Sequence, residues 1–210
     1  MGRLFPQEYP EDPQSCFLVS GQSYFDDLKV SFDEIFSAPM KAEYDPTHRY
    51  CAGLDFGQQD DYTVMPVHDM TARCQVDLLR INHLSWSEMR RRVADKYKYW
   101  HLPRLLAETN SMGSTNIEEL RKLGVSVVPF TTDNTNKAAI IQGMHEKLDE
   151  GWKLQAHEVQ KHEMRIFVSS QTASGLWRLA AAGNGHDDTI IGNALALESS
   201  QMMRAGVDFV

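Results

Sequence analysis

The order of strand-like and helix-like segments between Arg49 and Glu150 limits the fold of this chain to one kind of sheet. Apolar and aromatic residues gather first in three consecutive segments that we expect to be strands: Arg49–Phe56, Tyr62–Asp69 and Arg73–Ile81. Their short connections favour an antiparallel meander. Helical segments then alternate with two short apolar ones: Ser85–Trp100, "RLLAE", Thr115–Gly124, "VSVVPF" and Thr135–Glu150. Because right-handed crossovers add strands in parallel, we expect an α/β fold with a mixed five-stranded central sheet flanked by helices.

The two ends of the chain differ from this regular middle part. Residues 1–46 are interrupted by prolines and are expected to form an arm or linker, whereas residues 47–210 are expected to form the domain. The segment Arg165–Ala182 has the pattern of a β-hairpin that turns at Ser174–Gly175. A final helix is expected to begin at "HDDT", so the extra hairpin lies directly before the last helix.

A carboxylate stands inside the first expected strand, in the stretch "RYCAGLDFG". Burying it is costly unless another group compensates its charge. Strand alternation puts Asp55 on the same face as Gly53 and Gly57, neither of which has a side chain. The opposite face carries apolar residues: Ala52, Leu54 and Phe56. We therefore expect open space around Asp55, which suits a ligand better than core packing.

Further carboxylates follow other expected elements of the sheet. Glu108 ends the fourth strand, and Asp187 and Asp188 stand at the start of the last helix, where the helix dipole favours negative charge. Each of them alone fits an ordinary strand end or helix cap. Together they repel one another unless a hard cation lies between them, and Mg²⁺ and Mn²⁺ prefer oxygen ligands. Two such ions about 3.5–4 Å apart form the clamp used for in-line attack on a phosphodiester.

The composition restricts the class of protein less strongly. The formal net charge of −8 fits a protein that holds divalent cations, one that binds DNA only within a larger assembly, or an ordinary acidic protein. The three cysteines are scattered, which favours a reducing compartment and argues against a zinc site or a disulfide framework. No segment is apolar enough to predict a membrane span or a signal peptide.

The acidic motifs resemble those of a known family. Asp55 in "GLDFGQQDDYTV", Glu108 in "LLAETNSMGSTNIEELRKLGV", Lys137 in "TNKAAIIQGMHEKLDEGWKL" and the stretch "NGHDDTIIGNALAL" look like the nuclease domain of phage large terminase subunits. That domain has a ribonuclease H-like fold close to the RuvC-type resolvases. The resemblance extends from Tyr50 to about Leu197, and the "GQSYFD" segment before it resembles the connection between the ATPase and nuclease domains.

This resemblance implies roles for the acidic residues and for one lysine. Asp55, Glu108 and Asp188 would be catalytic ligands of two Mg²⁺ or Mn²⁺ ions. Asp187 would be a further ligand or a carboxylate that supports the ligands. Lys137 would approach a phosphate or balance the acidic charge; a solvated lysine is the plainer interpretation.

The resemblance also implies a biological setting. The function would be endonucleolytic cleavage of concatemeric double-stranded DNA, with little sequence preference, during viral genome packaging in the host cell cytoplasm. The partners would be the portal protein, the small terminase subunit and an ATPase domain. No G-x-x-x-x-G-K-[ST] phosphate loop is present, so we expect the nuclease part alone, monomeric in isolation.

Two further residues are candidates for supporting roles. His186, next to the acidic pair, can hydrogen-bond a ligand carboxylate or a leaving oxygen, or can simply shape the turn. Arg178 lies in the expected hairpin, which can either gate the site to DNA or merely extend the sheet.

Two other functions fit the same residues. A Holliday-junction resolvase or another ribonuclease H-like nuclease would use the same chemistry on branched DNA or a hybrid. A docking domain that binds the portal or the small terminase subunit would keep the fold without cleavage.

Overall fold

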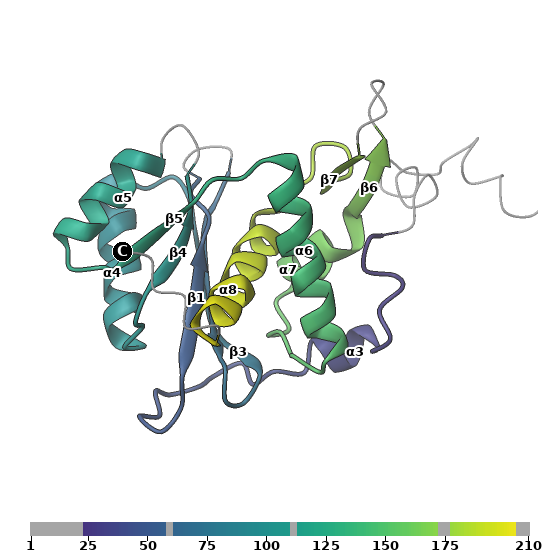
Figure 1. Ribbon diagram of the computed structural model, residues 1–210, viewed down its shortest axis with the longest axis horizontal. Coiled ribbons are helices and arrows are strands. Elements are labelled where there is room, and N and C mark those ends of the chain that lie inside the picture. Colours follow the sequence, from purple (N-terminus) through teal and green to yellow (C-terminus); the bar gives the residue numbers. More distant parts are fainter. Residues whose placement is uncertain (1–22, 58–60, 110–112, 172–176, 205–210) are drawn as a thin grey trace, which may run out of the picture.

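A computed structural model describes residues 23–57, 61–109, 113–171 and 177–204 of the chain (Figure 1). A central sheet separates two layers of helices, and a small two-stranded unit lies beside one of these layers (Figure 1).

The central sheet has five strands in the order β3-β2-β1-β4-β5. Its strands are β1 (Tyr50–Leu54), β2 (Thr63–Asp69), β3 (Cys74–Ile81), β4 (Leu105–Glu108) and β5 (Val127–Phe130). Strands β1, β2 and β3 are antiparallel neighbours, and β4 and β5 are added in parallel. The prediction of a mixed sheet made of a meander and two parallel strands is therefore confirmed.

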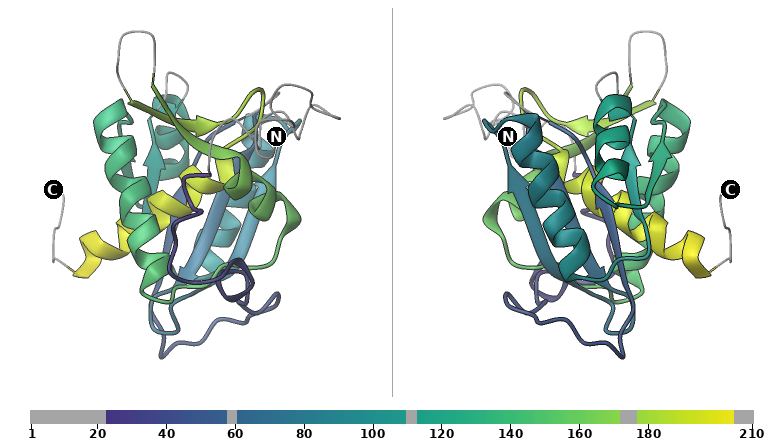
Figure 2. Two further views of the ribbon diagram at one scale, coloured as in Figure 1. Left: turned by 90° about the vertical axis from the view of Figure 1, so that its right-hand side faces the viewer. Right: turned by 90° about the vertical axis from the view of Figure 1, so that its left-hand side faces the viewer.

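Helices cover both faces of this sheet (Figure 1). Helices α4 (Trp86–Tyr99) and α5 (Gly113–Lys122) lie on one side. The other side carries α6 (Asn134–Asp149), α7 (Glu158–Ile166) and α8 (Asp188–Arg204), and α8 runs obliquely across the sheet (Figure 2).

Local sequence signals explain where the helices begin and end. Ser85 accepts a hydrogen bond from the backbone of Glu88, and Asp133 forms a reciprocal capping box with Asn136. Gly151, at φ 88°, follows the end of α6 in the left-handed region, where glycine is favoured. Helix α5 begins at Gly113, two residues before the predicted start at Thr115.

The two faces of β1 contribute to two separate cores. One face of β1, formed by Tyr50, Ala52 and Leu54, packs with α4 and α5. Cys51 packs on the opposite side with α6 and α8. The face predicted from strand alternation is confirmed, and Asp55 therefore belongs to the side that α8 covers.

The hairpin predicted before the last helix is confirmed as a two-stranded sheet separate from the central one. Its strands are β6 (Phe167–Gln171) and β7 (Trp177–Ala181). The predicted turn at Ser174–Gly175 lies outside the described residues. The described end of β7 leads through Ala182 toward the start of α8, so the hairpin and the acidic pair are close in the chain.

Residues 23–49 run along the domain and contain the short helix α3 (Phe32–Ile35). Phe25 and Ile35 are 1% exposed and pack in the core beneath α6 and α7. The backbone of Tyr24 donates to the carbonyl oxygen of Phe167 at 2.7 Å, which joins this segment to β6. Part of the expected arm is thus buried against the domain.

Within the described part of the chain, no helix combines the length and the apolar character that crossing a bilayer requires.

Candidate metal centre

Asp55 and Glu108 are neighbours at one edge of the central sheet. The parallel register of β1 and β4 pairs Gly53 with Leu106 and Leu54 with Ala107, so one further step brings Asp55 beside Glu108. Asp55 is held by two backbone hydrogen bonds with Val64, of 3.0 and 2.9 Å. The carboxyl group of Glu108 lies near enough to that of Asp55 to raise the pKa of Asp55.

The surroundings of Asp55 make its negative charge costly. The residue is 8% exposed. Burial raises the pKa of Asp55 well above its ordinary value, and the charge and hydrogen bond of Glu108 raise it further. The negative charges of Asp188 and Asp187 act in the same direction. A divalent cation would relieve this repulsion by compensating the negative charges of the carboxylates.

Helix α8 approaches this edge closely because β1 contains a glycine. A Cβ atom on Gly53 would lie 2.4 Å from the backbone of Gly192 and Ala196. The expected open space around Asp55 is therefore wrong on this side: the missing side chain leaves room for the backbone of α8. The glycine instead lets α8 pack directly on the sheet, with Asp188 at its first position.

Asp188 is buried at the start of α8 and is 7% exposed. Burial raises its pKa from 3.8 to about 6, and the negative charge of Asp61 adds to this effect. A hydrogen bond from the backbone nitrogen of Tyr62, at 3.3 Å to Oδ2, lowers the pKa, as does His186. The carboxylate is thus anchored by one backbone donor and faces further acidic groups.

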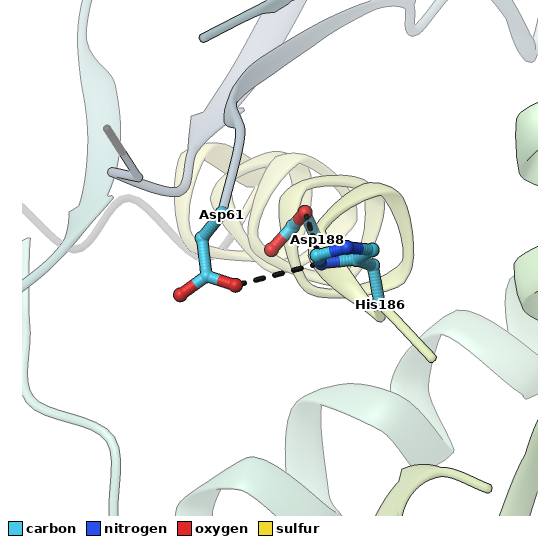
Figure 3. Close-up of side chains that lie close together, drawn as sticks. All are labelled: Asp61, His186 and Asp188. Carbon is cyan, nitrogen blue, oxygen red and sulfur yellow. Dashed lines mark ion pairs between the residues drawn. The ribbon is translucent and has the colours of Figure 1, made fainter. Parts of the chain in front are cut away.

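The structure adds Asp61 to the residues predicted from the sequence. One ligand atom each from Asp61, His186 and Asp188 lie within 4.8 Å of one another, a spacing that can hold a metal ion (Figure 3). His186 Nδ1 is 3.5 Å from Asp61 Oδ1 and 3.7 Å from Asp188 Oδ2. The available signal was the acidic pair just before the second strand in "GQQDDYTV".

Asp187 and Asp188 have different surroundings although they are adjacent. The backbone oxygen of Asp187 accepts the first hydrogen bonds of α8, at 3.0 Å from each of the nitrogens of Ile190 and Ile191. Its side chain pairs with Lys137 of α6, at 3.0 Å from Nζ to Oδ2. Lys137 therefore lies beside the acidic cluster, and it balances Asp187 directly.

Arg178 lies on the hairpin strand β7, not on one of the elements that carry the acidic residues. It is exposed in β7 opposite Ser170. Among the described residues, no hydrogen bond or ion pair joins it to the acidic cluster. Contact between Arg178 and the reacting atoms would need a bound substrate that spans the hairpin and the sheet edge.

The donor set has a clear chemical preference. Asp55 and Glu108 come from adjacent strands, whereas the residues whose ligand atoms lie within 4.8 Å of one another are Asp61, His186 and Asp188; among the described residues, this group does not include Asp55 or Glu108. Carboxylate oxygens with at most one imidazole suit Mg²⁺ or Mn²⁺ better than a structural zinc ion. A cluster of this kind can hold divalent cations at the edge of a rigid sheet, where they can activate water and neutralise a phosphate.

The comparisons with known proteins agree with this chemistry. The chain matches no protein-family profile. It is 31% identical over 198 residues to the large terminase subunit of Thermus virus P23-45, a match that covers 91% of this chain. The chain spans 40% of the length of that relative.

Solved structures resemble the fold over most of its length. The large terminase nuclease of thermophilic phage G20c with bound magnesium superposes with a TM-score of 0.76 and 28% identity, covering 84% of this chain and 97% of that one. The nuclease domain of the large terminase from bacteriophage SPP1, with bound Mn, gives a TM-score of 0.53 at 17% identity over 85% of this chain and 99% of that one, and so supports the fold alone. The predicted ribonuclease H-like fold is confirmed.

Proposed function

This chain is a homologue of phage large terminase subunits in the region of their nuclease domain, and we propose that it is a divalent-metal-dependent endonuclease that cuts double-stranded DNA. The observation that carries this proposal is the convergence of Asp55, Glu108 and Asp188 from two strands and a helix start. Burial and the nearby Glu108 raise the pKa of Asp55, which marks the place where a cation would compensate buried negative charge.

Asp55, Glu108 and Asp188 are the ligands in this proposal, and Asp61 is available as another. Two bound Mg²⁺ or Mn²⁺ ions would supply an activated water and would stabilise the charge that develops around phosphorus. The protein holds its ligands on a rigid sheet edge and a helix start, so little reorganisation is needed.

Lys137 and His186 have supporting roles in the same proposal. Lys137 neutralises Asp187 at 3.0 Å and places a positive charge where the DNA backbone would approach the cluster. His186, near Asp61 and Asp188, can carry a proton to a leaving oxygen or hold a ligand carboxylate. Arg178, on the exposed hairpin, is assigned to the DNA backbone farther from the reacting atoms.

The substrate and partners follow from the family. We assign the chain to concatemeric viral DNA in the host cytoplasm, cut with little sequence preference when packaging starts and ends. The portal, the small terminase subunit and an ATPase domain are its partners in the complete assembly. A net charge of −8 predicts weak, salt-sensitive DNA binding by the isolated, monomeric domain.

Plasmid cleavage tests this function. Supercoiled DNA is incubated with the protein in Mg²⁺, Mn²⁺ or EDTA, beside Asp55→Asn and Asp188→Asn. Asp95→Asn is the matched control, because Asp95 is an exposed carboxylate on α4 paired with Arg91. We expect metal-dependent nicking and linearisation that both site variants lose and the control retains.

Other outcomes point to the other functions. Strong preference for a four-way junction over linear duplex would identify a resolvase. Intact plasmid and intact junctions in every lane, with the protein folded, would favour a docking domain. Cleavage that survives both substitutions would show that the site is elsewhere.

A further inference from the structure

A buried carboxylate beneath the candidate metal centre is not explained by the proposed metal ligands. Glu163, in α7, is 1% exposed. Its Oε2 accepts two hydrogen bonds from Thr189, one from the backbone nitrogen at 2.8 Å and one from the hydroxyl at 2.5 Å. Because Thr189 directly follows Asp188, Glu163 binds the first turn of α8 next to the proposed ligand.

An arginine on β3 approaches the same carboxylate from the sheet. Arg80 Nη2 lies 3.8 Å from Glu163 Oε1. The guanidinium carbon of Arg80 also lies 3.2 Å from the centre of the Tyr62 ring, a cation–π contact. The backbone nitrogen of Tyr62 in turn donates to Asp188 Oδ2 at 3.3 Å.

These contacts approach Asp188 from two sides. Glu163 holds the residue after Asp188, while Arg80 holds the segment whose backbone nitrogen anchors the Asp188 carboxylate. Three elements, β3, α7 and the segment before β2, thereby meet at one helix start. The contacts leave this first turn few alternative positions.

The cost of this arrangement argues against simple packing. Burial raises the pKa of Glu163 from 4.5 to about 7, although the hydrogen bonds from Thr189 lower it. A neutral side chain would cap a helix start without placing another acid near Asp188. The negative charge of Asp188 raises the pKa of Glu163 further. A carboxylate at this position is therefore expensive for stability alone.

We propose that Glu163 and Arg80 are positioning residues that fix the first turn of α8 and the Tyr62 segment, so that Asp188 is held ready to bind a divalent cation. This inference rests on the proposed metal-dependent function. Neither residue is a ligand in it: both act through the backbone that holds Asp188. Substituting a residue that supports a metal ligand commonly weakens metal binding about 10–100-fold.

Mn²⁺ binding by the folded protein tests the proposal directly. Calorimetry and the Mn²⁺-induced rise in Tm are measured for Glu163→Ala, Glu163→Gln and Arg80→Met. We expect Glu163→Ala and Arg80→Met to weaken Mn²⁺ binding about ten-fold or more. Glu163→Gln retains an oxygen that can accept from Thr189 and should restore most of the affinity.

The matched control is Gln160→Met on the same helix. Gln160 is also 1% exposed and contacts α8, but through the side-chain nitrogen of Asn193 at 2.8 Å, one turn beyond Asp188. Its loss leaves buried polar groups unpaired and should lower Tm, while Mn²⁺ affinity remains within about two-fold of wild type. The comparison therefore distinguishes a specific loss of Mn²⁺ affinity from a general loss of protein stability.

The outcomes also separate this proposal from the proposed function. Folded Glu163→Ala and Arg80→Met proteins that both bind Mn²⁺ as wild type does would overturn the positioning role, whether or not plasmid is cut. Should Glu163→Ala fail to fold, the Arg80→Met protein decides. Wild-type protein that binds Mn²⁺ but leaves plasmid and junctions intact would overturn the nuclease function alone.

Discussion

The Cβ position of Gly53 in β1 lies 2.4 Å from the backbone oxygen of Gly192 in α8, a separation that a real Cβ atom essentially never has. Helix and strand therefore touch backbone to backbone at this point. Asp188 lies about one helical turn before Gly192, and Asp55 lies two residues after Gly53. The contact between the two glycines thus sets how near the two carboxylates come to each other.

Gly53→Ala tests this dependence. The added methyl group overlaps backbone atoms that cannot turn away, so α8 must shift outward. We expect a loss of about 1–3 kcal/mol or more in unfolding free energy and a marked loss of Mn²⁺ affinity. Urea unfolding and calorimetry measure the two effects.

Gly143→Ala is the control for this substitution. A Cβ there would meet only the end of the flexible Gln201 side chain, at 3.1 Å. Because alanine favours the interior of a helix such as α6, we expect unchanged or slightly higher stability and unchanged metal binding. Equal behaviour of Gly53→Ala and Gly143→Ala would contradict the close-approach argument.

In the metal-free protein, the contributions of Asp188 and Glu163 to stability should fall as the pH rises. Burial raises the pKa of Asp188 from 3.8 to about 6 and that of Glu163 from 4.5 to about 7. These two carboxyl groups therefore bind more protons in the folded than in the unfolded state between about pH 4 and 7, and their contribution to the unfolding free energy falls over this range. For Asp188 alone the fall is about 2–3 kcal/mol. Burial lowers the pKa of His68 from 6.5 to about 4, which acts in the opposite direction.

Comparison with Asp188→Asn isolates this contribution from other titrating groups. In urea unfolding with EDTA, the stability of the variant relative to wild type should increase from pH 4 to pH 7. Added Mn²⁺ should stabilise wild type more at pH 8 than at pH 5, because the cation competes with protons for the same oxygens. A difference between variant and wild type that does not change with pH would contradict the assigned burial effect.

Asp55→Asn should separate stability from function. At pH 8 without metal, the substitution removes one of several like charges around a buried site, so we expect a higher Tm than in wild type. It should also abolish the Mn²⁺-induced rise in Tm and plasmid cleavage. The exposed Asp95→Asn control should change the unfolding free energy by no more than about 0.5 kcal/mol. It should leave the Mn²⁺-induced rise in Tm and plasmid cleavage unchanged. A lower Tm for metal-free Asp55→Asn would mean that the carboxylate stabilises the fold without a cation.

The sequence predicted the parts of this molecule that depend on local patterns. Strand alternation placed Asp55 on the face away from the first apolar core, and the parallel addition of β4 brings Glu108 beside it. Apolar periodicity and capping residues located α4, α5, α6 and the start of α8 to within about two residues of their observed ends. The space around Asp55 was misjudged, because only the three-dimensional packing reveals that α8 occupies the gap at Gly53.

The residues that the sequence did not reveal depend on contacts between distant segments. Asp61 joins the cluster because the segment before β2 lies beside the start of α8. Glu163 and Arg80 look like surface charges on amphipathic elements, and their meeting depends on how α7 packs against the sheet. No local period or spacing encodes such an encounter.

Lys137→Met tests whether the charge beside Asp187 is functional. The substitution removes the 3.0 Å ion pair and leaves Asp187 uncompensated next to the other carboxylates. We expect cleavage to fall about ten-fold or more at saturating Mn²⁺, with a smaller change in Tm, because the lost charge would otherwise stabilise the phosphate in the transition state.

Lys147→Met, farther along the same helix, is the control for Lys137→Met. Lys147 Nζ lies 2.8 Å from Glu150 Oε2, and this ion pair is not part of the acidic cluster. Lys137→Arg should recover part of the activity, because it restores the positive charge with a different shape. Wild-type cleavage by Lys137→Met would reduce Lys137 to a solvated lysine. A fall of equal size in Lys147→Met would instead point to the overall charge of the protein, acting on DNA through long-range electrostatics that added salt should then suppress.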